Sequence, residues 1–148
     1  MRFDLFTETP LATIYFFNLE CDNGWKRFQN KCYRFFEEKV VWDTAKERCN
    51  ANLSNLVSIH SEKEFQFIKS QIEASTSASS DELIWTGLRG SKTTSWTWQD
   101  GSIYDWTNWE EDQPNGVTIE CMYLWREQGY QWADSPCSDY SLSFLCEK

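Results

Sequence analysis

The chain is short of three things that whole classes of protein require: basic charge, histidine and a long apolar run. Its 148 residues include 14 Lys and Arg against 23 Asp and Glu, which gives a formal net charge of −9. A protein that grips a nucleic-acid backbone needs basic side chains for the phosphates, so this balance excludes nucleic acid as a partner. No apolar run reaches the length of about 18 residues that a membrane-spanning helix needs, so the chain is not expected to span a membrane.

The sequence also lacks the cysteine and histidine pattern of a zinc site. His60 is the single histidine, and no two cysteines are spaced as Cys-x-x-Cys. The six cysteines are Cys21, Cys32, Cys49, Cys121, Cys137 and Cys146. An even number at wide, unequal gaps predicts three disulfides, and therefore a secreted or extracellular protein. The spacing by itself does not choose among the possible pairings.

What the chain has in abundance is aromatic side chains, at 17% of the residues, with nine Trp among them. This composition is inconsistent with disorder, and the length corresponds to one domain, which we place at residues 21–148. Residues 1–20 precede it. Within them, Leu11–Phe17 is a short apolar stretch that fits either a poor signal peptide, because Asp4 and Glu8 lie upstream, or an edge strand of high β propensity.

The first half of the chain predicts a hairpin and two helices. The aromatic and basic segment Gly24–Phe36 has a turn at Gln29-Asn30, which is typical of a hairpin. Helical spacing from Trp42 to Cys49 predicts the first helix. Ser61 followed by Glu64 is a capping-box signature, which predicts that a second helix begins there.

The second half predicts short strands around one long irregular segment. Strand-like patterns occur at residues 56–59, 83–88, 121–125, 130–134 and 143–146. Residues 90–116 are rich in Gly, Trp, Asp and Asn without a regular period, and a loop of this length in a compact domain is usually functional. Helices followed by a meander of strands predict the α+β class.

Several motifs, taken in order, resemble the long form of the C-type lectin-like domain. They are Gly24-Trp25, Cys32-Tyr33, Cys49, Trp85-Thr86-Gly87-Leu88, Cys121, Cys137 and Cys146. The resemblance implies the C-type lectin-like fold, with two helices packed on antiparallel sheets, a long irregular loop and three disulfides. It also implies the pairing Cys21–Cys32, Cys49–Cys146 and Cys121–Cys137.

The long loop contains Gln113-Pro114-Asn115, where lectins of this family carry Glu-Pro-Asn or Gln-Pro-Asp around a cis proline. In those lectins both flanking side chains hold calcium and sugar. Amide and carboxylate oxygens suit calcium, a hard cation with an all-oxygen shell. Glu120 offers a further carboxylate, one residue later than the acid of many sugar-binding relatives, where this chain has Ile119. The resemblance implies the same four residues for carbohydrate and calcium: Gln113, Asn115, Glu120 and Asp134.

This candidate site departs from the family pattern. The family's Trp-Asn-Asp motif reads Trp132-Ala133-Asp134 here, and Ala133 has no side-chain oxygen to offer. Only two of the four predicted ligands are charged, which predicts weak calcium binding. No Asp or Glu lies between Leu88 and Gln99, so we expect no auxiliary calcium site and at most one principal ion.

Two functions follow as hypotheses. The first is a weak, calcium-dependent carbohydrate-binding module whose partners are glycans or a glycoprotein. The alternative is a calcium-independent lectin-like domain that recognises a protein or another surface ligand, as Ala133 favours. An enzyme would have to use His60, or Glu110 with Asp134, and nothing in the sequence indicates a raised pKa for either carboxylate. We therefore predict a binding domain with no catalytic residues.

Overall fold

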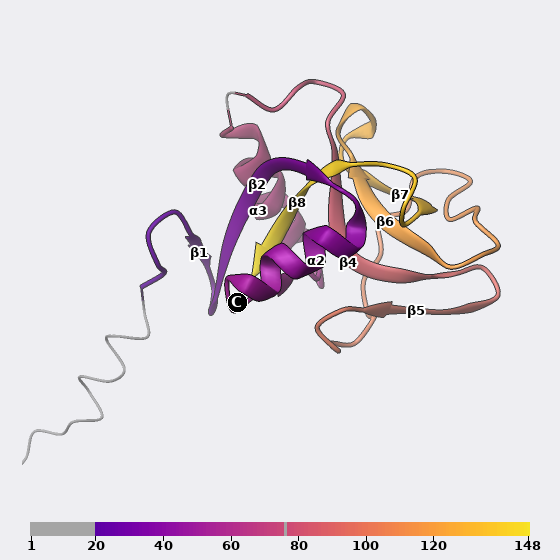
Figure 1. The fold of residues 1–148 in the computed structure, drawn as a ribbon, viewed down its shortest axis with the longest axis horizontal. Coiled ribbons are helices and arrows are strands. Elements are labelled where there is room, and N and C mark those ends of the chain that lie inside the picture. Colours follow the sequence, from indigo (N-terminus) through magenta and orange to yellow (C-terminus); the bar gives the residue numbers. More distant parts are fainter. Residues whose placement is uncertain (1–19, 76) are drawn as a thin grey trace, which may run out of the picture.

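The computed structural model describes residues 20–75 and 77–148 (Figure 1). The segment predicted as a signal peptide or an edge strand lies outside the described residues. In the part of the chain that is described, no helix is long and apolar enough to cross a membrane.

Both predicted helices are present, as α2 (Trp42–Ala51) and α3 (Glu62–Glu73). The predicted cap is also confirmed, because the Ser61 side chain accepts a hydrogen bond from the Glu64 backbone N–H at 3.1 Å. The Glu64 carboxylate in turn accepts the backbone N–H of His60 at 2.7 Å. These two hydrogen bonds satisfy backbone donors that the start of a helix would otherwise leave unpaired.

The strands form a single mixed sheet. They are β1 (Lys26–Phe28), β2 (Lys31–Val40), β3 (Asn55–Leu56), β4 (Leu83–Ser91), β5 (Thr94–Trp98), β6 (Glu120–Trp125), β7 (Gln131–Pro136) and β8 (Leu142–Glu147). The strand order is β1-β2-β8-β4-β6-β7, with β3 paired to β8 and β5 paired to β4. Strands β4 and β8 run parallel, so the sheet is not wholly antiparallel as the resemblance implied.

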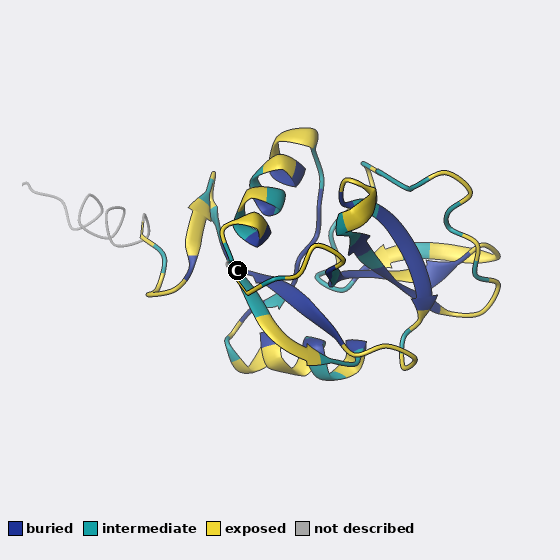
Figure 2. Cartoon of the chain, turned by 90° about the horizontal axis from the view of Figure 1, so that it is seen from above, coloured by how far each residue is buried: buried dark blue, intermediate teal, exposed yellow. Residues whose placement is uncertain are grey.

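The two helices cover opposite faces of β2 and β8, as Figure 2 shows. Trp42, Ala45 and Cys49 of α2 pack with Phe144 in one buried cluster. On the other side, α3 contributes to a second cluster that also contains the aromatic side chains of the long loop. The α3 residues are Phe65, Ile68 and Ile72. The core is therefore divided by the sheet, and the candidate loop rests on the α3 side.

Two sequence predictions need correction. The strand predicted at residues 56–59 is only β3, because Val57 hydrogen-bonds to Leu145 and Gly87 singly rather than as part of a ladder. The segment predicted as irregular from residue 90 begins with a regular strand, β5, which forms a hairpin with β4. Gly90 permits this hairpin, since a Cβ there would lie 2.7 Å from the Ser95 carbonyl oxygen.

Three disulfides link the pairs that the resemblance implied: Cys21–Cys32, Cys49–Cys146 and Cys121–Cys137. Cys49–Cys146 ties α2 to β8 across 97 positions of the chain. Cys121–Cys137 ties β6 to the residue after β7. Cys121–Cys137 therefore holds together β6 and β7, the two strands that carry Glu120 and Asp134 of the candidate site.

Candidate functional site

The long loop, residues 99–119, is held against the sheet by Trp132 of β7. Trp132 is fully buried, and the rings of Trp98, Trp106 and Trp109 meet it edge-on at centroid distances of 5.8, 5.6 and 5.6 Å. Edge-to-face contacts of this kind favour packed aromatic clusters. The loop backbone adds two hydrogen bonds to Trp132 at 2.9 Å, one from Glu110 and one to Asn108. These tryptophans therefore pack the loop onto the body of the domain.

Asp134 of β7 connects directly to the predicted loop residues. Its Oδ1 accepts the backbone N–H of Asn115 and its Oδ2 accepts that of Gly116, each at 3.0 Å. The backbone N–H of Asp134 faces the Gln113 amide oxygen at 3.4 Å. The Gln113–Pro114 peptide is cis, as the resemblance implied. Three of the four predicted site residues are thus joined by hydrogen bonds.

Glu120, the fourth predicted residue, begins β6 and is only 4% exposed. Its Oε1 accepts a hydrogen bond from the Thr118 hydroxyl at 2.7 Å. Its side chain lies so close to Gly116 that a Cβ there would overlap the Glu120 carboxyl group. The Glu120 side chain therefore lies against the same loop at Gly116. Glycine permits this contact because it has no side chain.

The donor set fits a hard cation in part. Glu120 Oε2 is buried and has no hydrogen-bond partner in the described structure, which leaves a carboxylate oxygen available. Both Asp134 oxygens, by contrast, already accept backbone N–H groups. Nowhere in residues 20–75 and 77–148 do three His, Cys, Asp or Glu side chains gather as a metal site would require. Any cation here would depend on the amide oxygens of Gln113 and Asn115.

The sequence reasoning missed three residues around this site. Gly116 and Thr118 position Glu120, while Val117 is 69% exposed beside them. A glycine immediately after the Gln-Pro-Asn triplet was the available signal for a close backbone approach. The exposed valine gives the loop an apolar rim.

His60 lies in a hydrogen-bond network at the start of the long loop. Its Nδ1 is 2.8 Å from an Asp105 oxygen, and its Nε2 is 3.0 Å from the hydroxyls of both Ser58 and Ser102. The distances are those of a Ser-His-Asp triad. The Ser102 hydroxyl and backbone N–H, however, both donate to Asp100, at 2.5 and 2.9 Å. The network holds the loop in place, and Ser102 is not set up as a nucleophile.

Glu147 of β8 also belongs to this network, through Ser58, and it is 3% exposed. The Ser58 hydroxyl lies between Glu147 and Asp100, at 2.8 and 2.7 Å from the two carboxylates. Burial, and after it the hydrogen bond to Asp100, raise the pKa of Glu147 to about 8, against the lowering effects of Lys31 and Ser58. Burial also acts to raise the pKa of Asp100, but hydrogen bonds from Glu147, Ser102 and Ser58 outweigh it and lower that pKa. The pKa values of the two carboxyl groups are therefore shifted in opposite directions.

Comparison with known families gives a match to the Lectin C-type domain over residues 38–148. Mouse (Mus musculus) C-type mannose receptor 2 is 37% identical over 134 residues, which cover 88% of this chain and 9% of the receptor. Ladderlectin of Oncorhynchus mykiss is 32% identical over 132 residues, which cover 87% of this chain and 68% of ladderlectin. The chain thus spans less than a tenth of the receptor.

Three solved structures are similar in fold. Human lithostathine superposes with a TM-score of 0.79 at 32% identity, covering 95% of each chain. A complex of SPL-1 with GlcNAc gives 0.77 at 27% identity, covering 88% of this chain and 96% of the other. A calcium-independent type II antifreeze protein gives 0.74 at 26% identity, covering 87% and 94%. With the family match over most of its length, this chain belongs to the C-type lectin domain family.

Proposed function

We propose that the chain is a carbohydrate-binding domain whose ligand site is the Gln113–Gly116 loop with Glu120 and Asp134. The observation that carries the proposal is the contact between Asp134 and the loop backbone. Gly116 of the same loop lies against the buried Glu120 side chain, and Asn115 is exposed to solvent. The SPL-1 complex with GlcNAc supports a sugar as the ligand.

We further propose one weakly held calcium ion at this site. Gln113, Asn115, Glu120 and Asp134 would hold it, and the unpartnered Glu120 Oε2 is the oxygen most in need of a cation. A bound calcium ion supplies coordination positions that sugar hydroxyls can complete. The amide groups of Gln113 and Asn115 orient the sugar by hydrogen bonds, and the exposed Val117 side chain offers an apolar contact for the ring.

Affinity for a single sugar should be weak, because the site has two carboxylates and Ala133 adds no oxygen. Useful binding then depends on multivalent display, in which several weak sites act together. Glycans or a glycoprotein are the partners that fit this behaviour. The three disulfides fit an extracellular location.

Isothermal calorimetry tests the proposal. Calcium is titrated with and without GlcNAc, mannose or galactose, into the wild type and into the double variant Gln113→Ala, Asn115→Ala. We expect saturable calcium binding that one sugar tightens and that the double variant loses. Sugar binding that is unchanged in the double variant would move the ligand site away from this loop.

A second candidate is a lectin-like domain that works without calcium. The Asp134 carboxylate favours it, since both oxygens are already paired with backbone N–H groups and the loop needs no ion to be held. The likeness to a calcium-independent antifreeze protein also supports it. The same titrations distinguish the two, because a sugar or surface ligand that binds equally in calcium and in a chelator favours this candidate.

A further inference from the structure

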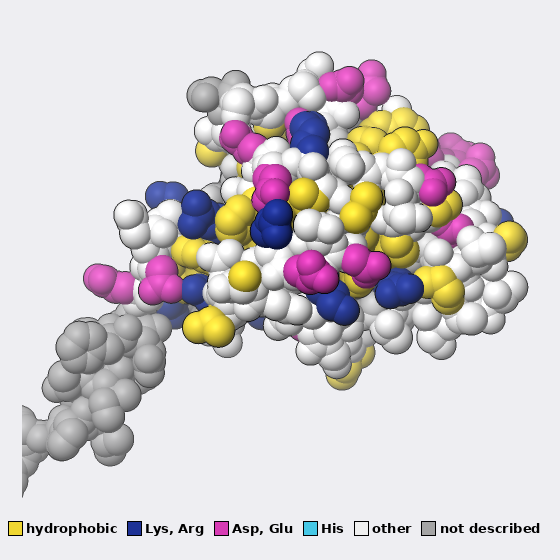
Figure 3. Space-filling view, in the orientation of Figure 1, with side chains coloured by type: hydrophobic (Ala, Val, Ile, Leu, Met, Phe, Trp, Pro, Cys, Tyr) yellow, Lys and Arg dark blue, Asp and Glu magenta, His cyan; other side chains and the backbone are white. Residues whose placement is uncertain are grey.

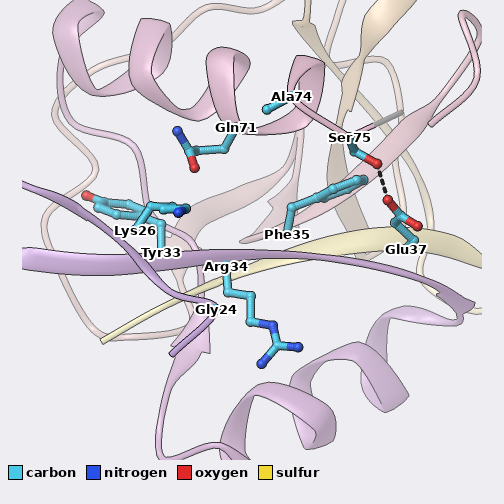
Figure 4. Close-up of a pocket in the computed structure, with 9 residues that line it drawn as sticks. All are labelled: Gly24, Lys26, Tyr33, Arg34, Phe35, Glu37, Gln71, Ala74 and Ser75. Carbon is cyan, nitrogen blue, oxygen red and sulfur yellow. Dashed lines mark hydrogen bonds between the residues drawn. The ribbon is translucent and has the colours of Figure 1, made fainter. Parts of the chain in front are cut away.

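A cavity of about 270 Å³ lies between β2 and the C-terminal end of α3 (Figure 4). Lys26 and Tyr33 line one side, Phe35 the other, and Gln71 faces them from the helix. The strand order places β1, beside this cavity, at the opposite end of the sheet from β7 and the candidate sugar site. The cavity is therefore separate from the loop discussed above.

The cavity opens along an unpaired strand edge. On its outer side β2 pairs with β1 only through Lys31, Cys32 and Tyr33. From Arg34 to Val40, no other strand of the described residues pairs with that side of β2, while β8 occupies the inner side. An unpaired edge presents backbone N–H and C=O groups to which another extended chain can add. Arg34 also lines the cavity, and Figure 4 shows its side chain extending from β2 to the side opposite Phe35 and Gln71.

Basic side chains gather around β1, at one end of this edge, as the dark blue Lys and Arg of Figure 3 show. Residues 24–36 contain four Lys or Arg and no Asp or Glu, so the other 135 residues carry −9 − 4 = −13. Lys26 is exposed, and its ammonium forms no ion pair with the described residues. Glu37 lies at the other end, where its carboxylate accepts hydrogen bonds from the hydroxyls of Ser75 and Ser77. The edge thus runs from a free cation to a carboxylate.

We propose that this edge and cavity bind an extended peptide segment of a partner protein, by addition of a strand to β2. Backbone hydrogen bonds to β2 supply the pairing, and one apolar side chain of the peptide enters the cavity beside Tyr33 and Phe35. An acidic side chain of the peptide pairs with Lys26. The end of the peptide near Glu37 carries a neutral or basic residue, because a carboxylate there is repelled. This surface is independent of the sugar site.

The test uses short blocked peptides and the whole domain. Acetylated and amidated Glu-Thr-Val-Thr-Lys, and its reverse Lys-Thr-Val-Thr-Glu, present the apolar side chain and both charges on one face of the strand, in the two possible directions. Each is titrated to about 5 mM, a range suited to weak binding, while the backbone amide signals of residues 34–37 are followed by NMR. We expect saturable shifts at these amides with one of the two peptides. No saturable shift with either peptide would overturn the proposal.

Matched variants and a second set of probes test the charge contact and the strand pairing separately. Lys26→Glu should weaken binding about tenfold, while Lys63→Glu, an equal charge change at an exposed position on α3, should leave it unchanged. A peptide with Pro in place of its central Val should not bind, because Pro lacks the N–H that a strand ladder needs. Equal binding by the Pro peptide or by Lys26→Glu contradicts strand addition. A sulfated disaccharide that shifts the same amides more strongly than either peptide would make the surface an anion site instead.

Discussion

Asp134 on β7 and Asn115 in the long loop are joined by a hydrogen bond of 3.0 Å, from the Asn115 backbone N–H to Asp134 Oδ1. Asp134 pairs with Met122 of β6, and the disulfide Cys121–Cys137 ties the same two segments together. The Asn115–Gly116 segment is therefore attached to the sheet through this carboxylate, in addition to the Trp132 contacts that hold the rest of the loop. Removing that carboxylate should affect the ligand site more than the fold.

Asp134→Ala should abolish sugar binding and leave the domain folded. Two hydrogen bonds to a charged acceptor are lost, which should lower the free energy of unfolding by about 1–3 kcal/mol. Denaturant unfolding and calorimetry with the sugar identified for the wild type measure the two effects. Asp139→Ala, at an exposed turn position, is the control and should change neither by more than about 0.5 kcal/mol. Full sugar affinity in Asp134→Ala would show that the loop contact is not needed for binding.

Gly116→Ala should displace the Glu120 carboxyl group. The added methyl would overlap the Glu120 side chain, so either the loop or the carboxylate must move. We expect calcium affinity to fall at least about tenfold, equivalent to about 1.4 kcal/mol. Gly101→Ala is the comparison, since a Cβ there meets nothing within 4 Å although its backbone is left-handed. Calcium binding that is equal in Gly116→Ala and the wild type would remove Glu120 from the ligand set.

The sequence predicts the scaffold better than it predicts the site. The capping pair Ser61 and Glu64 fixes the start of α3 because the signal is local, and the helix begins where it indicates. Strand β5 was not predicted, because it depends on its pairing with β4. That pairing requires the two backbones to approach closely at Gly90.

Within the site, the residue types give the four candidates but not their partners. That both Asp134 oxygens face backbone N–H groups, while one Glu120 oxygen has no partner, depends on the meeting of three segments. No pattern within one segment contains that information. The His60 network is similar, since it joins residues that are more than 40 positions apart.

Stability should depend on pH through Glu147. Its pKa is about 8 in the folded domain, above the ordinary value of 4.5, so folding favours the protonated form. This contribution is complete below pH 4.5 and is lost as the pH rises to about 8. The free energy of unfolding should fall by up to about 1.4 kcal/mol per pH unit over this range. Glu147→Gln, which cannot ionise, should flatten the dependence in denaturant unfolding between pH 5 and pH 8.

The control for this measurement is Glu73→Gln, at an exposed position on α3. It should follow the wild-type curve. Parallel pH curves for Glu147→Gln and the wild type would mean that Glu147 is ionised in the folded domain.

The disulfides should differ in what they contribute. Cys49–Cys146 joins residues 97 positions apart, whereas Cys21–Cys32 spans 11. In the chain-entropy model, removal of the long bridge costs about 4.7 kcal/mol and removal of the short one about 2.8 kcal/mol. Paired Cys→Ala variants compared by denaturant unfolding check this order. A larger loss from the short bridge would mean that the hairpin, and not the closure of the chain, determines stability.

The most direct test of the central claim follows the loop itself while sugar is added. Isotope-labelled protein is titrated with GlcNAc in calcium, and again in a chelator, while NMR reports the side-chain amides of Gln113 and Asn115 and the backbone amide of Gly116. The account predicts saturable shifts at these three signals, larger in calcium than in the chelator. Sugar-induced shifts confined to other parts of the domain would contradict it.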